Sequence, residues 1–164
     1  VAAIVRAAND HGVPLYPIST GNNVGLGTRS APSADMVVLD LGRRMNRILE
    51  LDEKLGYAAI EPGVSFQMMA DELMRRGGQW MMSVTSGPPE GGMLGNAMDK
   101  GAGYGPLFDH FGFSCGMEVV LGTGEVIRTG EPRMVRVDLT EDLLSLSPAV
   151  CGGIMEIFVE AVGV

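Results

Sequence analysis

Residues 17–27 have the types and spacing of an anion-binding loop. They read Pro-Ile-Ser-Thr-Gly-Asn-Asn-Val-Gly-Leu-Gly, follow an apolar run and contain no acid. Glycine lets the main chain adopt positive φ and lets a ligand come close, and successive N–H groups can surround an anion. Phosphate or pyrophosphate is therefore the simplest ligand. The alternative is an ordinary surface turn, because glycine and asparagine gather in turns for conformational reasons alone.

Two common phosphate-binding motifs do not fit this loop. No Lys-Ser or Lys-Thr pair closes it, as a P-loop would require. The next periodic segment, residues 36–41, is typical of a strand, whereas the glycines of a Rossmann fold open a helix.

A second glycine-rich stretch spans residues 87–106. Six of its glycines fall within 15 residues: Gly91, Gly92, Gly95, Gly101, Gly103 and Gly105. A loop this long in a compact domain is usually functional or disordered. Its apolar residues, such as Leu94 and Tyr104, disfavour disorder. We expect an ordered wrap around a large flat ligand, with polar main-chain groups bonding the ring edge.

The composition restricts the class of protein. The 164 residues are 46% hydrophobic, which suits one globular domain with a core. A net charge of −8 disfavours nucleic acid as a partner, and no apolar run is long enough to span a bilayer. Two histidines are too few for a His-rich metal site, so no metal is predicted. Cys115 and Cys151 lack CxxC spacing and are expected to be buried thiols of a reducing compartment. The cytoplasm is expected, or the periplasm if a signal was removed.

Hydrophobic periodicity predicts an α+β order of elements without regular βαβ alternation. Helices are expected over residues 1–11, from a Ser65 cap to residue 76, and over 140–146. Strands are expected over 13–18, 36–41, 47–52, 57–61, 114–121, 125–129, 134–139 and 154–162, with hairpins at 53–56 and 122–124. Residues 83–105 are expected to lack regular structure. The methionines of the second helix, Met68, Met69 and Met74, are expected in the core.

Six segments in order carry a resemblance to a known family. They are residues 17–27, 38–41 with 45–48, 61–66, 94–104 (Leu-Gly-Asn-Ala-Met-Asp-Lys-Gly-Ala-Gly-Tyr), 109–110 and 115–130. Together they resemble the FAD-binding domain of the vanillyl-alcohol oxidase / p-cresol methylhydroxylase flavoproteins, particularly members similar to 4-cresol dehydrogenase. The likeness covers about residues 1 to 130 and fades after Gly130.

The resemblance implies two small α+β subdomains with FAD between them, at about residues 1–78 and 79–164. No substrate cap domain of the family is expected in this chain. The implied cofactor-binding residues are Pro17, Ile18, Ser19, Thr20, Gly21, Asn22, Asn23, Val24, Gly25, Pro88, Pro89, Gly91, Gly92, Leu94, Gly95, Asn96, Asp99, Gly101, Gly103, Tyr104, Gly153 and Ile154. The first loop would hold the pyrophosphate, and Tyr104 is the implied catalytic residue beside the flavin. Structural roles are expected for His110 and Glu118, and a turn for Asp109.

The sequence departs from the family at several positions. Asn22 stands where the family usually carries Arg, and Leu26 replaces a Tyr that helps bind phenolate. Gly87 stands where vanillyl-alcohol oxidase has an Asp near the flavin. Asn23 occupies the place of the loop histidine that links flavin covalently in related oxidases. FAD is therefore more strongly implied than the substrate.

The resemblance implies an FAD-dependent oxidoreductase that transfers a hydride from a 4-alkylphenol or benzylic alcohol to the flavin. The alternative is a non-catalytic flavin- or nucleotide-binding module, or a fragment that needs a partner chain. The implied partner is a small aromatic substrate, with a homodimer or a separate cap domain left open.

Overall fold

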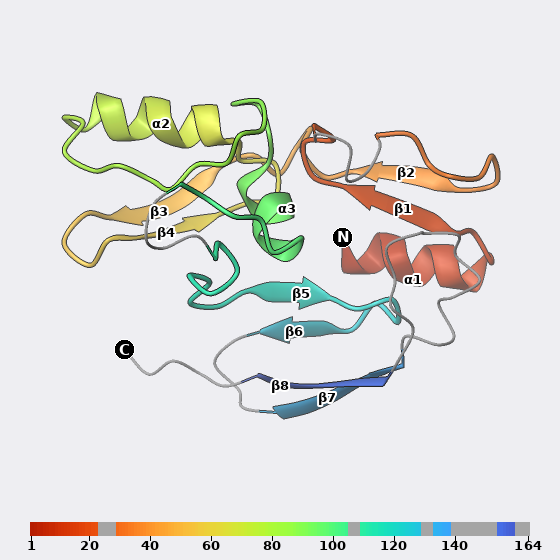
Figure 1. Cartoon of the computed structure of the whole chain (residues 1–164). Helices are drawn as coiled ribbons and strands as arrows, with labels where there is room; N and C mark the ends of the chain where they lie inside the picture. The colour runs from red at the N-terminus through yellow and green to blue at the C-terminus, as the bar shows by residue number, and fades with distance from the viewer. Residues whose placement is uncertain (23–28, 105–108, 129–132, 139–153, 160–164) are drawn as a thin grey trace. The chain divides into compact units, whose positions relative to one another are not determined.

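The computed structural model describes residues 1–22, 29–104, 109–128, 133–138 and 154–159 (Figure 1). Its contacts form two compact units. The first comprises Val1–Leu15, Ala31–Val37 and Cys115–Val164, and the second comprises Tyr16–Ser30 and Val38–Ser114. Both glycine-rich stretches lie in the second unit. The expected division near residue 78 stays a prediction.

The first unit joins a helix to a hairpin. Helix α1 (Ala2–Asp10) begins this unit, and β5 (Glu118–Val120) pairs antiparallel with β6 (Val126–Arg128). Arg6 donates to the Gly124 carbonyl at 2.8 Å, and Asn9 donates to that of Gly122 at 2.7 Å. Side chains of α1 therefore bind main-chain carbonyls in the tight turn of this hairpin.

The last two strands also form an antiparallel pair. Strands β7 (Arg133–Asp138) and β8 (Ile154–Val159) pair from Arg133↔Val159 to Asp138↔Ile154. Both strands were expected. The short helix predicted over residues 140–146, and Cys151, lie outside the described residues.

Strands β1 (Leu15–Ile18) and β2 (Val37–Asp40) form a two-stranded sheet. The Val37 N–H donates to the Pro14 carbonyl at 2.9 Å, and the Leu41 N–H donates to that of Ile18 at 3.0 Å. Residue numbers increase in the same direction along both strands between these two bonds, so the strands run parallel. The first glycine-rich stretch follows directly from the end of β1.

The predicted hairpin of the second unit is confirmed. Strands β3 (Ile48–Asp52) and β4 (Tyr57–Ile60) pair antiparallel, with Asp52 opposite Tyr57. The Asp52 carboxylate accepts from the N–H groups of Lys54 and Leu55 at 2.8 and 3.0 Å, as in an Asx turn. Gly56 closes the turn with φ of 71°.

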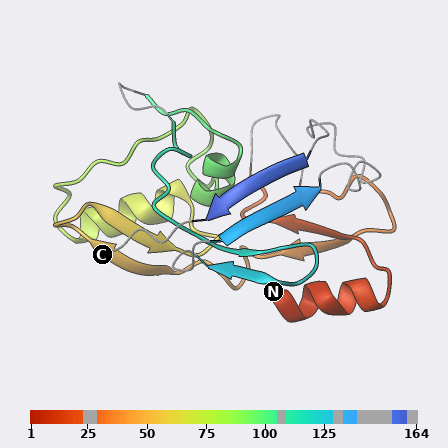
Figure 2. The ribbon, with the colours of Figure 1, turned by 90° about the horizontal axis from the view of Figure 1, so that it is seen from below.

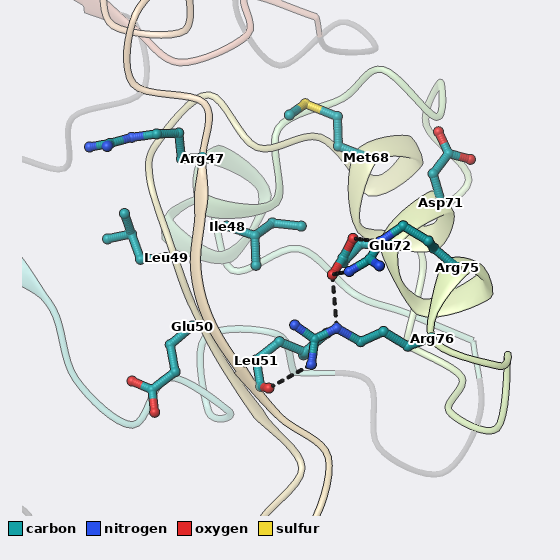
Figure 3. Close-up of a pocket in the computed structure, with 10 residues that line it drawn as sticks. All are labelled: Arg47, Ile48, Leu49, Glu50, Leu51, Met68, Asp71, Glu72, Arg75 and Arg76. Carbon is teal, nitrogen blue, oxygen red and sulfur yellow. Dashed lines mark hydrogen bonds and ion pairs between the residues drawn. The ribbon is translucent and has the colours of Figure 1, made fainter.

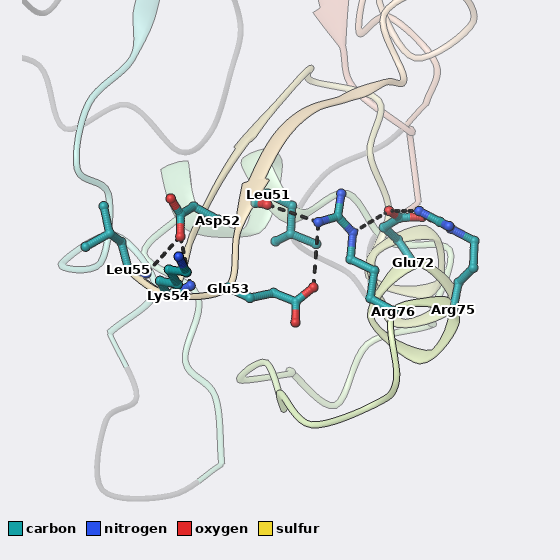
Figure 4. A network of polar contacts seen from close by, with 8 residues as sticks. All are labelled: Leu51, Asp52, Glu53, Lys54, Leu55, Glu72, Arg75 and Arg76. Carbon is teal, nitrogen blue, oxygen red and sulfur yellow. Dashed lines mark hydrogen bonds and ion pairs between the residues drawn. The ribbon is translucent and has the colours of Figure 1, made fainter.

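Helix α2 (Phe66–Arg75) begins at its predicted cap, because the Ser65 hydroxyl accepts from the Met68 N–H at 3.2 Å. The helix runs beside the β3–β4 hairpin in Figure 1 and Figure 2. Figure 4 shows the contacts that attach the C-terminal end of α2 to this hairpin. Arg76 donates to the Leu51 carbonyl at 3.2 Å, lies 3.6 Å from Glu53 and shares Glu72 with Arg75.

Three expectations about this part of the chain were wrong. Residues 83–105 are not without regular structure, since α3 (Met93–Met98) forms within them. Met69 is buried, but Met68 and Met74 are 37% and 72% exposed, so only one of the three fills the core. Cys115 is exposed rather than buried.

The core of the second unit lies under the glycine-rich stretches. Val64 is fully buried, and Ile18, Phe66 and Met69 are nearly so. These side chains come from β1, α2 and the segment before α2. None of the helices in the described ranges is both long and apolar enough to cross a membrane.

Candidate functional site

The loop after β1 meets the segment that leads into α3. The Asn22 side-chain amide donates to the Glu90 carbonyl at 3.2 Å. A β-carbon built on Gly92 would lie 2.9 Å from the Ser19 hydroxyl oxygen, and one on Gly95 would lie 3.0 Å from it. The structure thus brings the two predicted glycine-rich stretches together within one unit, and a β-carbon at either glycine would require the Ser19 side chain or the backbone to shift.

Main-chain packing fixes the position of the first loop. The Gly42 N–H donates to the Ser19 carbonyl at 3.1 Å, and a β-carbon on Gly42 would collide with that same oxygen. A β-carbon on Gly63 would lie 2.6 Å from the Gly42 Cα and 2.7 Å from the Met45 carbonyl. Sequence reasoning assigned no role to Gly42 or Gly63. The signal available was that Gly63 falls inside the matching segment 61–66.

The start of α2 orients the second stretch. The N–H groups of Phe66 and Gln67 donate to the carbonyls of Gly91 and Pro89 at 3.1 and 2.7 Å. First-turn N–H groups have no partner inside a helix, so these carbonyls cap α2 while the helix holds them in place. The Met93 N–H then donates to the Val64 carbonyl at 3.1 Å, which fixes the start of α3.

The groups that remain fit an anionic cofactor. The N–H groups of Leu94 and Gly95 donate to no described residue, and the Ser19 and Thr20 side chains lie against Gly92. Neither residues 17–22 nor residues 91–98 include an acid. Main-chain and hydroxyl donors suit the pyrophosphate of a dinucleotide.

The other predicted residues are distributed along the same elements. Pro17 and Ile18 end β1, Pro88 and Pro89 precede α3, Asn96 lies within it, and Asp99 is its C-cap. Gly21 has φ of 71°. Asn23, Val24, Gly25 and Gly153 lie outside the described residues, as do Leu26 and any contacts it makes. Ile154 begins β8, in the other unit.

The segment after α3 folds back on the helix. A β-carbon on Gly101 would collide with the Asn96 side chain, and one on Gly103 would collide with Ser83 and lie 2.6 Å from His110 Nε2. Packing within the chain is therefore enough to explain why glycine occupies both positions. Tyr104 follows them with 72% of its surface exposed. Its catalytic role stays a prediction.

The residues for which structural roles were predicted have them. The Asp109 carboxylate accepts from the N–H groups of Phe111 and Gly112 at 3.0 and 3.1 Å, which forms a turn. Glu118 makes an ion pair with Arg128 at 2.6 Å across the β5–β6 hairpin. His110 is hydrogen-bonded through both ring nitrogens.

A buried carboxylate fixes the segment before α2. Glu61 accepts from the Arg47 main-chain N–H at 2.8 Å and from its guanidinium at 2.8 and 3.2 Å. Hydrogen bonds from Arg47 lower the pKa of Glu61, and the carboxylate raises the pKa of Arg47. This pair positions the chain that leads to Val64 and Ser65, both neighbours of the glycine-rich stretch.

An open pocket of about 600 Å³ lies elsewhere, between β3 and α2 (Figure 3). Its walls are the aliphatic and charged side chains of those two elements, including Ile48, Leu51 and Met68. None of the predicted cofactor-binding residues lines it. Its three arginines are already paired with Glu61 or Glu72, so this lining offers a pyrophosphate no unpaired guanidinium. No group of His, Cys, Asp and Glu suited to a metal ion occurs among the described residues.

Comparison with known proteins agrees with this geometry. Residues 1–130 match the FAD binding domain family. The chain is 47% identical over 130 residues to 1'-carboxy-chondrochloren decarboxylase of Chondromyces crocatus. The matched region covers 79% of this chain and 24% of that protein. The chain is 42% identical to the flavoprotein subunit of 4-cresol dehydrogenase (hydroxylating) of Pseudomonas putida, covering 79% and 25%.

A solved structure is similar over the same part of the chain. The 4-ethylphenol oxidase of Gulosibacter chungangensis, in complex with isoeugenol, superimposes with a TM-score of 0.73 and 45% identity, covering 79% of this chain and 24% of that one. The present chain therefore spans about a quarter of the length of the relatives it matches. It belongs to the FAD binding domain family, and its cofactor is FAD.

Proposed function

We propose that this chain is the cofactor-binding portion of an FAD-dependent oxidoreductase that transfers a hydride from a 4-alkylphenol or benzylic alcohol to the flavin. The approach of Ser19 to Gly92 and Gly95 carries the proposal, because it joins the two stretches into one main-chain site. The relatives named for 4-cresol and 4-ethylphenol support the substrate class. We further propose that FAD lies between two small α+β subdomains, divided near residue 78.

The residues of the chain bind and orient the cofactor. The Ser19 and Thr20 hydroxyls and the N–H groups of Leu94 and Gly95 would hold the pyrophosphate. Asn22 has its amide committed to the Glu90 carbonyl, so it joins the two stretches. Bound flavin supplies the hydride acceptor, and the protein supplies position and electrostatics.

Tyr104 is the proposed catalytic residue. Its side chain is 72% exposed, so its phenol is free to donate a hydrogen bond to a substrate oxygen. We propose that this donor stabilises negative charge on a phenolic substrate. We propose that other substrate contacts come from residues outside the chain described here.

The second candidate is a flavin-binding module without catalysis of its own. It is motivated by the departure from the family at Leu26, which stands where a phenolate-binding Tyr is usual. The two candidates share the FAD site and differ in whether bound flavin can be reduced by substrate.

Titration of the purified chain with FAD, followed by flavin fluorescence, tests the shared site. Anaerobic addition of 4-ethylphenol or a benzylic alcohol to the loaded chain then tests the chemistry. Loss of the visible flavin absorbance supports the oxidoreductase. Binding without reduction by either compound favours the module, and failure to bind FAD contradicts both.

A further inference from the structure

Three segments of the second unit meet at His110. Its Nδ1 contacts the Asn96 side-chain oxygen, and its Nε2 lies 2.9 Å from the Ser83 hydroxyl. Asn96 lies within α3, Ser83 belongs to the chain between α2 and α3, and His110 follows the segment after α3. The imidazole is partly buried and lies 6.2 Å from the Phe66 ring, measured between centroids.

The partners define the tautomer of a neutral imidazole. An amide oxygen only accepts, so Nδ1 carries the proton and donates to Asn96. In the neutral ring Nε2 then accepts from the Ser83 hydroxyl. Both ring nitrogens of His110 are thereby matched to complementary partners.

The backbone around His110 is built to make this contact. Lys100 adopts a left-handed conformation with φ of 52°, and the Gly101 N–H donates to the Asn96 carbonyl at 2.7 Å. Ala102 and Asp109 form an antiparallel bridge, and the His110 N–H donates to the Gly101 carbonyl at 3.1 Å. The chain therefore leaves α3, turns back and returns to the same helix.

We propose that His110 is a positioning residue for FAD, acting through Asn96 to hold α3 against the loop that carries Ser19. This inference rests on the proposed location of the FAD site. A helix of six residues is not stable by itself, so its orientation depends on tertiary contacts. Val64 holds its first residue through the main chain, and His110 holds its middle through Asn96. Leu94 and Gly95 lie between these two attachments.

The two ring nitrogens can be tested separately. Asparagine places a polar atom where His Nδ1 lies, and glutamine places one where Nε2 lies. His110→Asn therefore keeps the contact with Asn96, whereas His110→Gln keeps only the contact with Ser83. We expect FAD affinity within about threefold of the parent chain for His110→Asn and a loss of roughly tenfold for His110→Gln and His110→Ala. Ser83→Ala should also bind within about threefold.

Further measurements separate positioning from folding. Thermal unfolding of the FAD-free chain should show similar losses for the Asn and Gln variants, since each loses one hydrogen bond. The visible circular dichroism of bound FAD should change in the Gln variant and not in the Asn variant. His11→Asn, at an exposed histidine on the other unit, is the matched control and should change neither quantity.

Equal FAD affinity of the Asn and Gln variants would overturn the proposal, whatever their stability. If a His110 variant does not fold, Asn96→Ala must lose roughly tenfold in affinity while Ser83→Ala does not, and the opposite order overturns the proposal. Gly95→Val tests the site itself. Parent-like affinity in Gly95→Val contradicts the location of the FAD site, whereas weakened binding there with unchanged His110 variants contradicts only the role of His110.

Discussion

The Ser19 hydroxyl oxygen lies 3.0 Å from the position that a β-carbon on Gly95 would occupy. This contact is tighter than most that real side chains make, so a β-carbon at residue 95 requires the Ser19 hydroxyl or α3 to shift. The absence of a side chain at residue 95 thus favours the close approach of the loop after β1 to helix α3.

Substitution of Gly95 should therefore weaken FAD binding. Gly95→Ala pushes α3 away from Ser19, and overpacking of this kind costs about 1–3 kcal/mol. We expect FAD affinity to fall roughly tenfold for Ala and further for Val, measured by fluorescence titration. The control is Gly122→Ala, because a β-carbon there meets no atom within 4 Å. Parent-like affinity in both Gly95 variants would contradict the site.

The cap of α2 should contribute to stability. Ser65→Ala removes the acceptor of the Met68 N–H at a buried position, which should lower the free energy of unfolding by about 1 kcal/mol. Ser65→Thr retains a hydroxyl and should lose less. Urea unfolding of the three proteins, followed by circular dichroism, measures the difference. Equal stability of the Ala and Thr variants would show that the cap contributes nothing.

Glu72 should make stability depend on acid. Hydrogen bonds from Arg75 and Arg76 lower the pKa of Glu72 from 4.5 to about 2. Because the folded pKa is the lower one, this contribution is complete above about pH 4.5 and is lost as the pH falls toward about 2. The pair is partly exposed to solvent, so the effect is screened.

We expect Glu72→Gln to be less stable than the parent chain at pH 7, with the difference shrinking as the pH falls from about 4.5 to about 2. Denaturant melts at a series of pH values measure this. Asp10→Asn removes an exposed carboxylate that has no side-chain hydrogen bond to a described residue, and serves as the control. A difference that stays constant with pH would rule out the ion pair as its source.

The turn of the β3–β4 hairpin requires glycine. Gly56 has φ of 71°, and a β-carbon there would also lie 3.4 Å from the Trp80 ring. Gly56→Ala should lower the free energy of unfolding by about 1–2 kcal/mol, because left-handed backbone is unfavourable for residues with a β-carbon. Trp80 is the single tryptophan of the chain, so its fluorescence reports the unfolding directly. A parent-like melt would show that the turn relaxes without cost.

Local patterns predicted most elements of this fold. The β3–β4 hairpin could be predicted because its strands, its Asp52 turn and Gly56 are adjacent in sequence. Helix α2 has a cap and an apolar stripe. Helix α3 could not be predicted, because Gly95 disfavours a helix and the Val64 carbonyl that fixes its start is remote in sequence. The exposure of Met68 and Met74 depends on which segments pack against α2, and hydrophobic periodicity carries no information about those segments.

The candidate site was predictable in part for a related reason. Glycine and asparagine content indicated main-chain recognition, and the resemblance indicated the two stretches that meet. Gly42 and Gly63 were missed because backbone packed on backbone leaves no side-chain pattern in a sequence. The partnership of His110 with Asn96 was missed because it depends on the reversal at Lys100, where a lysine occupies left-handed backbone.

The bridge between Ala102 and Asp109 closes a loop at its base, with His110 anchored immediately beyond it. Tyr104 lies two residues beyond Ala102, so the backbone that leads to it is held by this bridge. The anchor that orients α3 through His110 thereby also limits where the proposed catalytic side chain can reach.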